Sequence, residues 1–203
     1  MKVELHLHTS RYSGCAVSSP DELMVRLIDA GYDAVYITEH DAVWPEEELS
    51  GLRSRFPRIR IFPGVELTVG ASASAHLLVL GTNDPAYVGM DPDEVSILSS
   101  ARAAGHLTIL AHPFRWSGGA DMLEFDVPPD AMELWTSNTD LSQARQASRV
   151  ARRMNLPVVN SGDVHSVGSV GRYWIETHRP VERAEDIRGI IRSGEYLNRL
   201  HGG

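Results

Sequence analysis

The chain has 203 residues, of which 42% are hydrophobic, and a formal net charge of −8 at pH 7. This size and composition fit one domain, residues 1–203, with a full hydrophobic core. The acidic balance argues against partners such as duplex nucleic acid or an anionic membrane surface. The sequence shows no apolar run that could span a bilayer and no secretory leader, so we expect a soluble, cytoplasmic protein. Its single cysteine, Cys15, excludes an internal disulfide and a cysteine-rich zinc module.

Apolar runs alternate with helix-start signals along the chain. In one such signal Ser19 is a helix cap, Pro20 suits the first helical position and Glu22 completes a capping box. In chain order we expect a strand at 2–7, a helix from 20 to a stop at Gly31, a strand at 34–38, a helix at 46–56, a strand at 58–62 closed by Pro63 and Gly64, a strand at 75–80, a helix from 91 to 105, strands at 107–111 and 131–135, a helix at 140–154, a strand at 157–160 and a helix at 184–192.

This alternation indicates the fold class. Strands that alternate with helices in one domain predict a parallel sheet covered by helices. Roughly seven such units favour a closed or nearly closed barrel over an open sheet. The sequence has no glycine-rich nucleotide loop after any expected strand, which also weakens the open-sheet alternative.

Two histidines at the end of the first expected strand suggest a metal site. His6 and His8 are two residues apart, so their side chains lie on the same side of a strand and converge. Histidine is the commonest protein ligand for metals, and the active sites of parallel barrels lie at the carboxyl ends of the strands. Further candidates stand at or near the ends of apolar runs: His40, Glu66, His76, His112, Asp163 and His165. This set suits zinc, manganese or iron, and it is too large for one ion, so we expect a cluster of at least two.

Six short motifs extend this pattern over nearly the whole chain. They are HLHTS at 6–10, ITEHD at 37–41, PGVELT at 63–68, HLLVLG at 76–81, ILAHPFR at 109–115 and NSGDVHS at 160–166. In sequence and in order these motifs resemble the PHP (polymerase and histidinol phosphatase) family of metal-dependent phosphoesterases. The resemblance implies an α/β fold, a distorted (β/α)7 TIM-like barrel in a single domain, with two or three divalent metals at its C-terminal face.

The resemblance also implies a distribution of ligands. His6, His8, Glu66 and Asp163 would hold the first metal, Glu66 would bridge to a second metal held by His76 and His112, and His40 and His165 would belong to a third. Two positions depart from the family pattern. The loop at 12–15 lacks the usual acidic or histidine ligand, and Glu39 stands where aspartate is usual. We therefore expect two metals and leave the third site open.

Other residues are candidates for supporting roles. Arg115 would hold a substrate phosphate through its planar guanidinium, and Arg11 and Arg172 are weaker candidates for the same role. Trp44 and Trp116 would line a substrate pocket, and Glu133 and Asn160 would support the ligands. We assign no role in the site to His106, His178 and His201.

The resulting hypothesis is hydrolysis of a phosphate ester by a hydroxide that bridges the metals. The substrate would be a phosphomonoester or phosphodiester, either a small molecule or a nucleotide, and the catalytic residues would be Glu66, Asp163, His165 and Arg115. The proton donor to the leaving group stays open among His40, His165 and a metal-bound water. One alternative is a non-catalytic or regulatory metal-binding PHP module. A metallo-amidohydrolase is less favoured, because such enzymes usually use a carbamylated lysine and the only lysine here is Lys2.

Overall fold

The computed structural model describes residues 1–70, 75–89, 93–116 and 119–202. Its elements in order are β1 (Lys2–Leu7), α1 (Pro20–Asp29), β2 (Ala34–His40), α2 (Glu46–Arg55), β3 (Arg60–Val69), β4 (Ala75–Leu80), α3 (Ala86–Gly89), α4 (Glu94–Ala104), β5 (Leu107–Ala111), β6 (Ala131–Trp135), α5 (Leu141–Met154), β7 (Val158–Asn160), β8 (Tyr173–Thr177), α6 (Asp186–Ser193) and β9 (Tyr196–Leu200). Short 3-10 turns occur at Gly119–Glu124 and Val167–Ser169.

Local capping sets the helix boundaries, as the sequence predicts. The side chain of Ser19 accepts a hydrogen bond from Glu22 N, and the Glu22 side chain bonds back, so the capping box at the start of α1 is confirmed. Asp140 forms a second capping box at the start of α5. Helix α4 ends at Gly105, whose positive φ of 81° suits glycine. The signal for the start of α4 at residues 91–92 lies outside the described residues.

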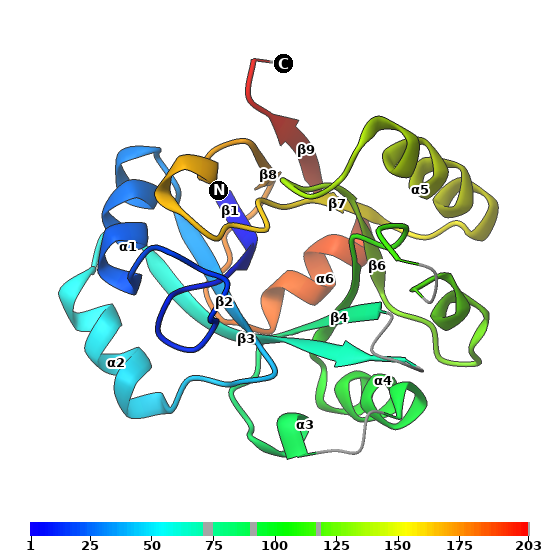
Figure 1. The fold of residues 1–203 in the computed structure, drawn as a ribbon, viewed down its shortest axis with the longest axis horizontal. Helices are drawn as coiled ribbons and strands as arrows, with labels where there is room; N and C mark the ends of the chain where they lie inside the picture. The colour runs from blue at the N-terminus through cyan, green and yellow to red at the C-terminus, as the bar shows by residue number, and fades with distance from the viewer. Residues whose placement is uncertain (71–74, 90–92, 117–118, 203) are drawn as a thin grey trace.

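The strands form one nine-stranded sheet that curls into a nearly closed mixed barrel (Figure 1). The strand order is β7-β6-β5-β4-β3-β2-β1-β8-β9. Its two edges meet through side chains, since Asn160 N donates to Asn198 Oδ1 at 2.6 Å and Asn160 Nδ2 donates to the Arg199 carbonyl at 3.0 Å. The α/β barrel in a single domain expected from the sequence is thus confirmed.

The sheet is mixed, so the prediction of a parallel sheet is wrong. Strand β4 pairs antiparallel with both β3 and β5, and β8 pairs antiparallel with both β1 and β9. Strands β8 and β9 were not expected from the sequence. The third strand does not stop at Pro63 and Gly64 but continues to Val69. Gly64 allows close packing there rather than a turn, because a Cβ at this residue would lie 3.0 Å from Leu80 Cδ2 and 3.1 Å from Thr38 Cγ2.

Three apolar clusters hold the barrel and its helices together. The first cluster fills the barrel interior and joins strand residues to the buried face of α6. Helix α6 closes the end of the barrel at which the parallel strands start. This cluster includes Val3, Ala34, Leu107, Ala131, Ile187, Ile190 and Ile191. A second cluster packs α4 and α5 on β3 to β6, and a third packs α1 and α2 on β1 to β3. The opposite end of the barrel is left for polar residues. Among the described residues, no helix combines the length and hydrophobicity needed to cross a membrane.

Candidate metal centre

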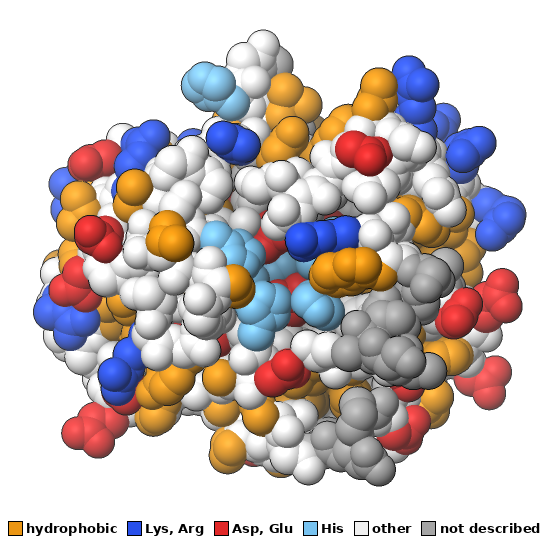
Figure 2. All heavy atoms as spheres, viewed as in Figure 1, with side chains coloured by type: hydrophobic (Ala, Val, Ile, Leu, Met, Phe, Trp, Pro, Cys, Tyr) orange, Lys and Arg blue, Asp and Glu red, His pale blue; other side chains and the backbone are white. Residues whose placement is uncertain are grey.

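All eight predicted ligands meet at the open end of the barrel. They come from six segments: His6 from β1 and His8 just after it, His40 at the end of β2, Glu66 within β3, His76 in β4, His112 after β5, and Asp163 and His165 after β7. Figure 2 shows several histidine side chains gathered in a hollow at the centre of this face. His76 lies at the start of β4, whereas the other candidate ligands lie at or near the ends of strands. Because β4 runs antiparallel to its neighbours, its start lies beside the ends of β3 and β5, where His76 pairs with Thr68 and Ala111.

Glu66 is the centre of the cluster and is fully buried. Its Oε2 lies 3.2 Å from His6 Nε2, 3.1 Å from His8 Nε2 and 3.0 Å from His40 Nδ1. Its Oε1 lies 2.8 Å from His76 Nδ1 and 3.2 Å from His112 Nε2. Each carboxylate oxygen therefore faces its own group of imidazoles.

Asp163 closes the cluster from the loop after β7. Its Oδ1 lies 3.5 Å from His6 Nε2 and 3.6 Å from His8 Nε2. Asn138 Nδ2 donates to the other oxygen, Oδ2, at 2.6 Å. Asp163 has a positive φ of 47°, and Gly162 before it fits closely against Glu4, where a Cβ would lie 2.6 Å from Glu4 Oε2. Sequence reasoning missed Asn138, because a polar residue in a loop carries no signal of its own.

Glu133 fixes the protonation of His6. The fully buried Glu133 carboxylate lies 2.8 Å from His6 Nδ1 and also accepts a hydrogen bond from His112 N at 2.7 Å. A carboxylate only accepts, so His6 Nδ1 donates and His6 Nε2 faces the cluster. The expectation that Glu133 supports the ligands agrees with this contact. Asn160 instead donates hydrogen bonds to Asn198 and Arg199 of β9, where the two edges of the sheet meet.

The donor set around His6 and His8 fits a cation. The two Nε2 atoms lie 2.9 Å apart, and both face the carboxylate oxygens of Glu66 and Asp163. Ligands about 2.1 Å from a tetrahedral ion lie about 3.4 Å from one another, and the separations here scatter around that value. Among the described residues, Glu66 Oε2 is buried with no hydrogen-bond donor. Acceptor atoms arranged in this way need a positive charge between them.

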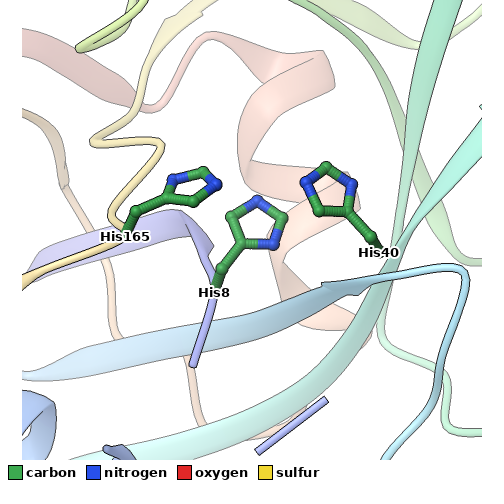
Figure 3. A group of neighbouring side chains, drawn as sticks. All are labelled: His8, His40 and His165. Carbon is green, nitrogen blue, oxygen red and sulfur yellow. The ribbon is translucent and has the colours of Figure 1, made fainter. Parts of the chain in front are cut away.

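A second set of imidazoles packs together at the mouth of the cluster, where His8 stacks on His40 and lies tilted against His165. Figure 3 shows His8 lying between His40 and His165, and both ring-centroid distances are 4.3 Å. Burial and the neighbouring imidazoles lower the pKa of His40 to about 4, against the opposing charge of Glu66. Burial and His8 also lower the pKa of His165. Both rings are therefore neutral near pH 7, which is the form that binds metals. Three groups of potential ligand atoms come close together: His8, His40 and His165; His6, His8 and Asp163; and His40, Glu66 and His76.

A cavity of about 690 Å³ opens above the cluster. Arg115, Trp116 and Arg172 line it together with His40, His76 and His112. The Arg115 guanidinium lies 4.6 Å from the ring centroid of Trp116, which is 41% exposed. Two other candidates lie outside the cavity. Arg11 pairs with Glu48 at 2.9 Å, and the buried Trp44 donates its Nε1–H to Glu39 at 3.0 Å.

His106, His178 and His201 lie outside the metal-ligand groups found among the described residues, and so does the predicted ligand His112, although His112 Nε2 lies 3.2 Å from Glu66 Oε1. His106 follows α4 and packs on Tyr87 with a ring-centroid distance of 5.9 Å. His178 follows β8, and His201 follows β9 and is exposed.

Comparison with solved structures identifies the fold. A two-domain protein from Bacteroides vulgatus, which contains a predicted PHP-like metal-dependent phosphoesterase, superposes with a TM-score of 0.75 over 99% of this chain at 16% sequence identity. The chain has the PHP-like metal-dependent phosphoesterase fold. It spans 65% of that two-domain protein. A family profile described as PHP-associated matches residues 142–196.

Two further structures share the PHP-like fold. A candidate metal-dependent phosphoesterase from Bifidobacterium adolescentis gives a TM-score of 0.67 at 14% identity and covers 93% of this chain and 94% of its own. An amidohydrolase from Chromobacterium violaceum, with bound sulfate and no metal, gives 0.66 at 16% identity, covering 97% of this chain and 98% of its own. No curated protein sequence matches the chain. Identities this low establish the fold and leave the reaction to be argued from the site.

Proposed function

We propose that the protein hydrolyses phosphate esters with the help of divalent metal ions bound at the open end of the barrel. The observation that carries this proposal is the placement of Glu66, whose two oxygens face separate groups of histidines. A single buried carboxylate arranged in this way is suited to bridge two cations. The likeness to proteins described as predicted or candidate metal-dependent phosphoesterases supports the same proposal.

The proposed ligand sets are those that the resemblance implies, and the distances around Glu66 are compatible with them, although His40 Nδ1 also lies 3.0 Å from Glu66 Oε2. His6, His8, Asp163 and Glu66 Oε2 would hold one ion, and His76, His112 and Glu66 Oε1 would hold another. His40 and His165 would belong to a third site, for which the loop at 12–15 supplies no acidic ligand. Imidazole with a few carboxylates suits zinc, manganese or iron. When bound, such ions supply a water with a pKa lowered toward about 7 and neutralise charge on phosphoryl oxygens.

The residues around the cavity would bind and orient the substrate. Arg115 presents a guanidinium that can form paired hydrogen bonds to a phosphate, and Arg172 lies on the same cavity. Trp116 offers an exposed ring beside them for a planar or apolar part of the substrate. His40 and His165 also line the cavity and are candidates for transferring a proton there. The substrate class includes small phosphomonoesters, phosphodiesters and nucleotides.

An amidohydrolase is the alternative suggested by one structural neighbour. Lys2, the only lysine of the chain, lies far from the cluster. Its Nζ donates to the Ala30 carbonyl at 2.9 Å and lies over the rings of Tyr32 and Trp174. A carbamylated lysine therefore cannot bridge metals here, and phosphate-ester hydrolysis is favoured. The eight candidate ligands that meet at this end of the barrel likewise favour a catalyst over a non-catalytic module.

The test is metal analysis of the purified protein followed by turnover with manganese, zinc or iron. Phosphomonoesters, phosphodiesters and cyclic amides should be assayed side by side. We expect at least two metals per chain and turnover of phosphate esters only, both lost in Glu66→Gln, which should stay folded. Turnover of amides alone would favour the amidohydrolase. Bound metal with no turnover of any substrate would favour the non-catalytic module.

A further inference from the structure

Ser13 contacts both the candidate ligand His8 and the buried acid Glu39. Ser13 is 1% exposed, and its Oγ lies 2.5 Å from Glu39 Oε2 and 3.3 Å from His8 Nδ1. The same oxygen accepts a hydrogen bond from the backbone N of His40 at 3.1 Å. A hydroxyl has one proton to donate and two lone pairs that accept. With three partners around it, Ser13 Oγ therefore donates one hydrogen bond and accepts two.

Glu39 fixes the direction in which Ser13 donates. The Glu39 carboxylate is fully buried and accepts hydrogen bonds from Thr9 N at 3.0 Å, from Thr9 Oγ1 and from Trp44 Nε1 at 3.0 Å. An ionised carboxylate only accepts hydrogen bonds, and Ser13 Oγ is a fourth donor to it. Ser13 must therefore donate its only proton to Glu39.

The proton on His8 follows from this. One lone pair of Ser13 Oγ is taken by the backbone N–H of His40, which can only donate. The other lone pair faces His8 Nδ1, so that nitrogen must carry a proton and donate it. His8 Nε2 is then the nitrogen left to face Glu66 at 3.1 Å and Asp163 at 3.6 Å.

We propose that Ser13 and Glu39 are positioning residues that hold His8 in the Nδ1–H tautomer with Nε2 turned to the metal centre. The proposal rests on the proposed function in one respect only, namely that His8 Nε2 binds a metal ion. It also accounts for the two departures of the chain from the family pattern. The loop at 12–15 contributes an oriented hydroxyl behind a ligand instead of a ligand, and the longer side chain of Glu39 reaches that hydroxyl from β2.

The test combines imidazole nitrogen NMR on the metal-free protein at alkaline pH with zinc affinity measured against a chromophoric chelator. Ser13→Ala removes the acceptor of His8 Nδ1–H, and Ser13→Thr restores a hydroxyl. Thr9→Val is the matched control, because it removes another buried hydroxyl that donates to the same carboxylate but does not contact His8.

We expect wild-type His8 to be protonated at Nδ1 and unprotonated at Nε2. Ser13→Ala should shift the tautomer toward Nε2–H and weaken zinc binding about 10-fold to 100-fold. Ser13→Thr and Thr9→Val should keep the wild-type tautomer and zinc affinity. If Ser13→Ala fails to fold, the wild-type spectrum still tests the proposal, because it shows which nitrogen of His8 carries the proton.

A proton on Nε2 of wild-type His8, or an unchanged tautomer and affinity in Ser13→Ala, would overturn the proposal. The tautomer readout is independent of turnover. A protein that shows the expected tautomers but hydrolyses no phosphate ester would refute the proposed function and leave this inference standing.

Discussion

Asn138 Nδ2 lies 2.6 Å from Asp163 Oδ2, which leaves Asp163 Oδ1 to face His6 and His8. The loop that carries Asn138 is joined to the loop of Asp163 by a second hydrogen bond, from Ser137 Oγ to the Gly162 carbonyl at 2.6 Å. Asp163 adopts a positive φ, a backbone conformation that the surrounding structure must hold in place. The direction of its side chain therefore depends on these contacts between the two loops. The two loops after β6 and β7 thus shape one wall of the candidate metal centre together.

Replacing Asn138 should weaken the metal centre. We expect Asn138→Ala to lower metal affinity about 10-fold, because Asp163 is then free to turn away from His6 and His8. Thr139→Ala in the same loop is the control and should bind metal as the wild type does. Affinities from chelator competition would settle the point, and equal affinities for both variants would contradict it.

Glu133 should matter for metal binding, and Asp130 on the same segment should not. Both carboxylates are buried, but Glu133 holds His6, whereas Asp130 pairs with Arg188 and Arg192 at the opposite end of the barrel. We expect Glu133→Gln to lower metal affinity about 10-fold to 100-fold. Asp130→Asn should lower the melting temperature and keep the affinity. A loss of affinity in Asp130→Asn would show that the effect is general destabilisation.

Arg115 should affect substrate binding. If it holds a phosphoryl group, Arg115→Ala should raise KM about 10-fold to 100-fold, which corresponds to a lost charged hydrogen bond. Arg115→Lys should recover part of the loss because the charge is kept. Arg11→Ala is the control, since Arg11 is paired with Glu48 away from the cavity. Steady-state kinetics in which Arg115→Ala behaves like Arg11→Ala would remove Arg115 from the site.

Glu4 should make stability depend on pH in an unusual direction. Burial raises the pKa of Glu4 to about 8, although its Oε1 accepts backbone hydrogen bonds from Leu5, His6 and Gly162. Between the ordinary pKa of about 4.5 and this value, the folded chain keeps a proton that the unfolded chain releases. Folding stability from this group is therefore present below the ordinary pKa and is lost as pH rises through that window.

The variant Glu4→Gln removes this dependence, because the amide oxygen can accept the same backbone bonds and carries no charge. Its melting temperature relative to the wild type should increase from about pH 5 to about pH 8 and then level off. The half-buried Glu176→Gln on β8 is the control, because Glu176 pairs with Arg199 and does not hold a proton in this pH window. Thermal melts of the metal-free proteins measure both, and a difference independent of pH would contradict the raised pKa.

The candidate ligand residues could be picked out from the sequence because metal binding restricts the choice of residue type. His6 and His8 converge in any strand, and Asp163 and His165 follow a short apolar run, so the pattern is visible without a structure. The capping residues of α1 were predictable for a similar reason, since Ser19 and Glu22 act on backbone groups within their own helix turn.

Only the tertiary structure decided the direction of β4, the closure of the barrel by β8 and β9, and the residues behind the ligands. His76 reaches Glu66 because β4 runs antiparallel, and no local pattern encodes the direction of a strand. Asn138 and Ser13 contact Asp163 and Glu39, which are distant in the sequence, so no local pattern indicates their roles. Glu133 was a candidate from the sequence, but its partner His6 was visible only in the structure. The chain's own residues thus determined the chemistry of the centre, whereas long-range packing decided its geometry, because hydrogen-bond partners in a barrel come from different strands.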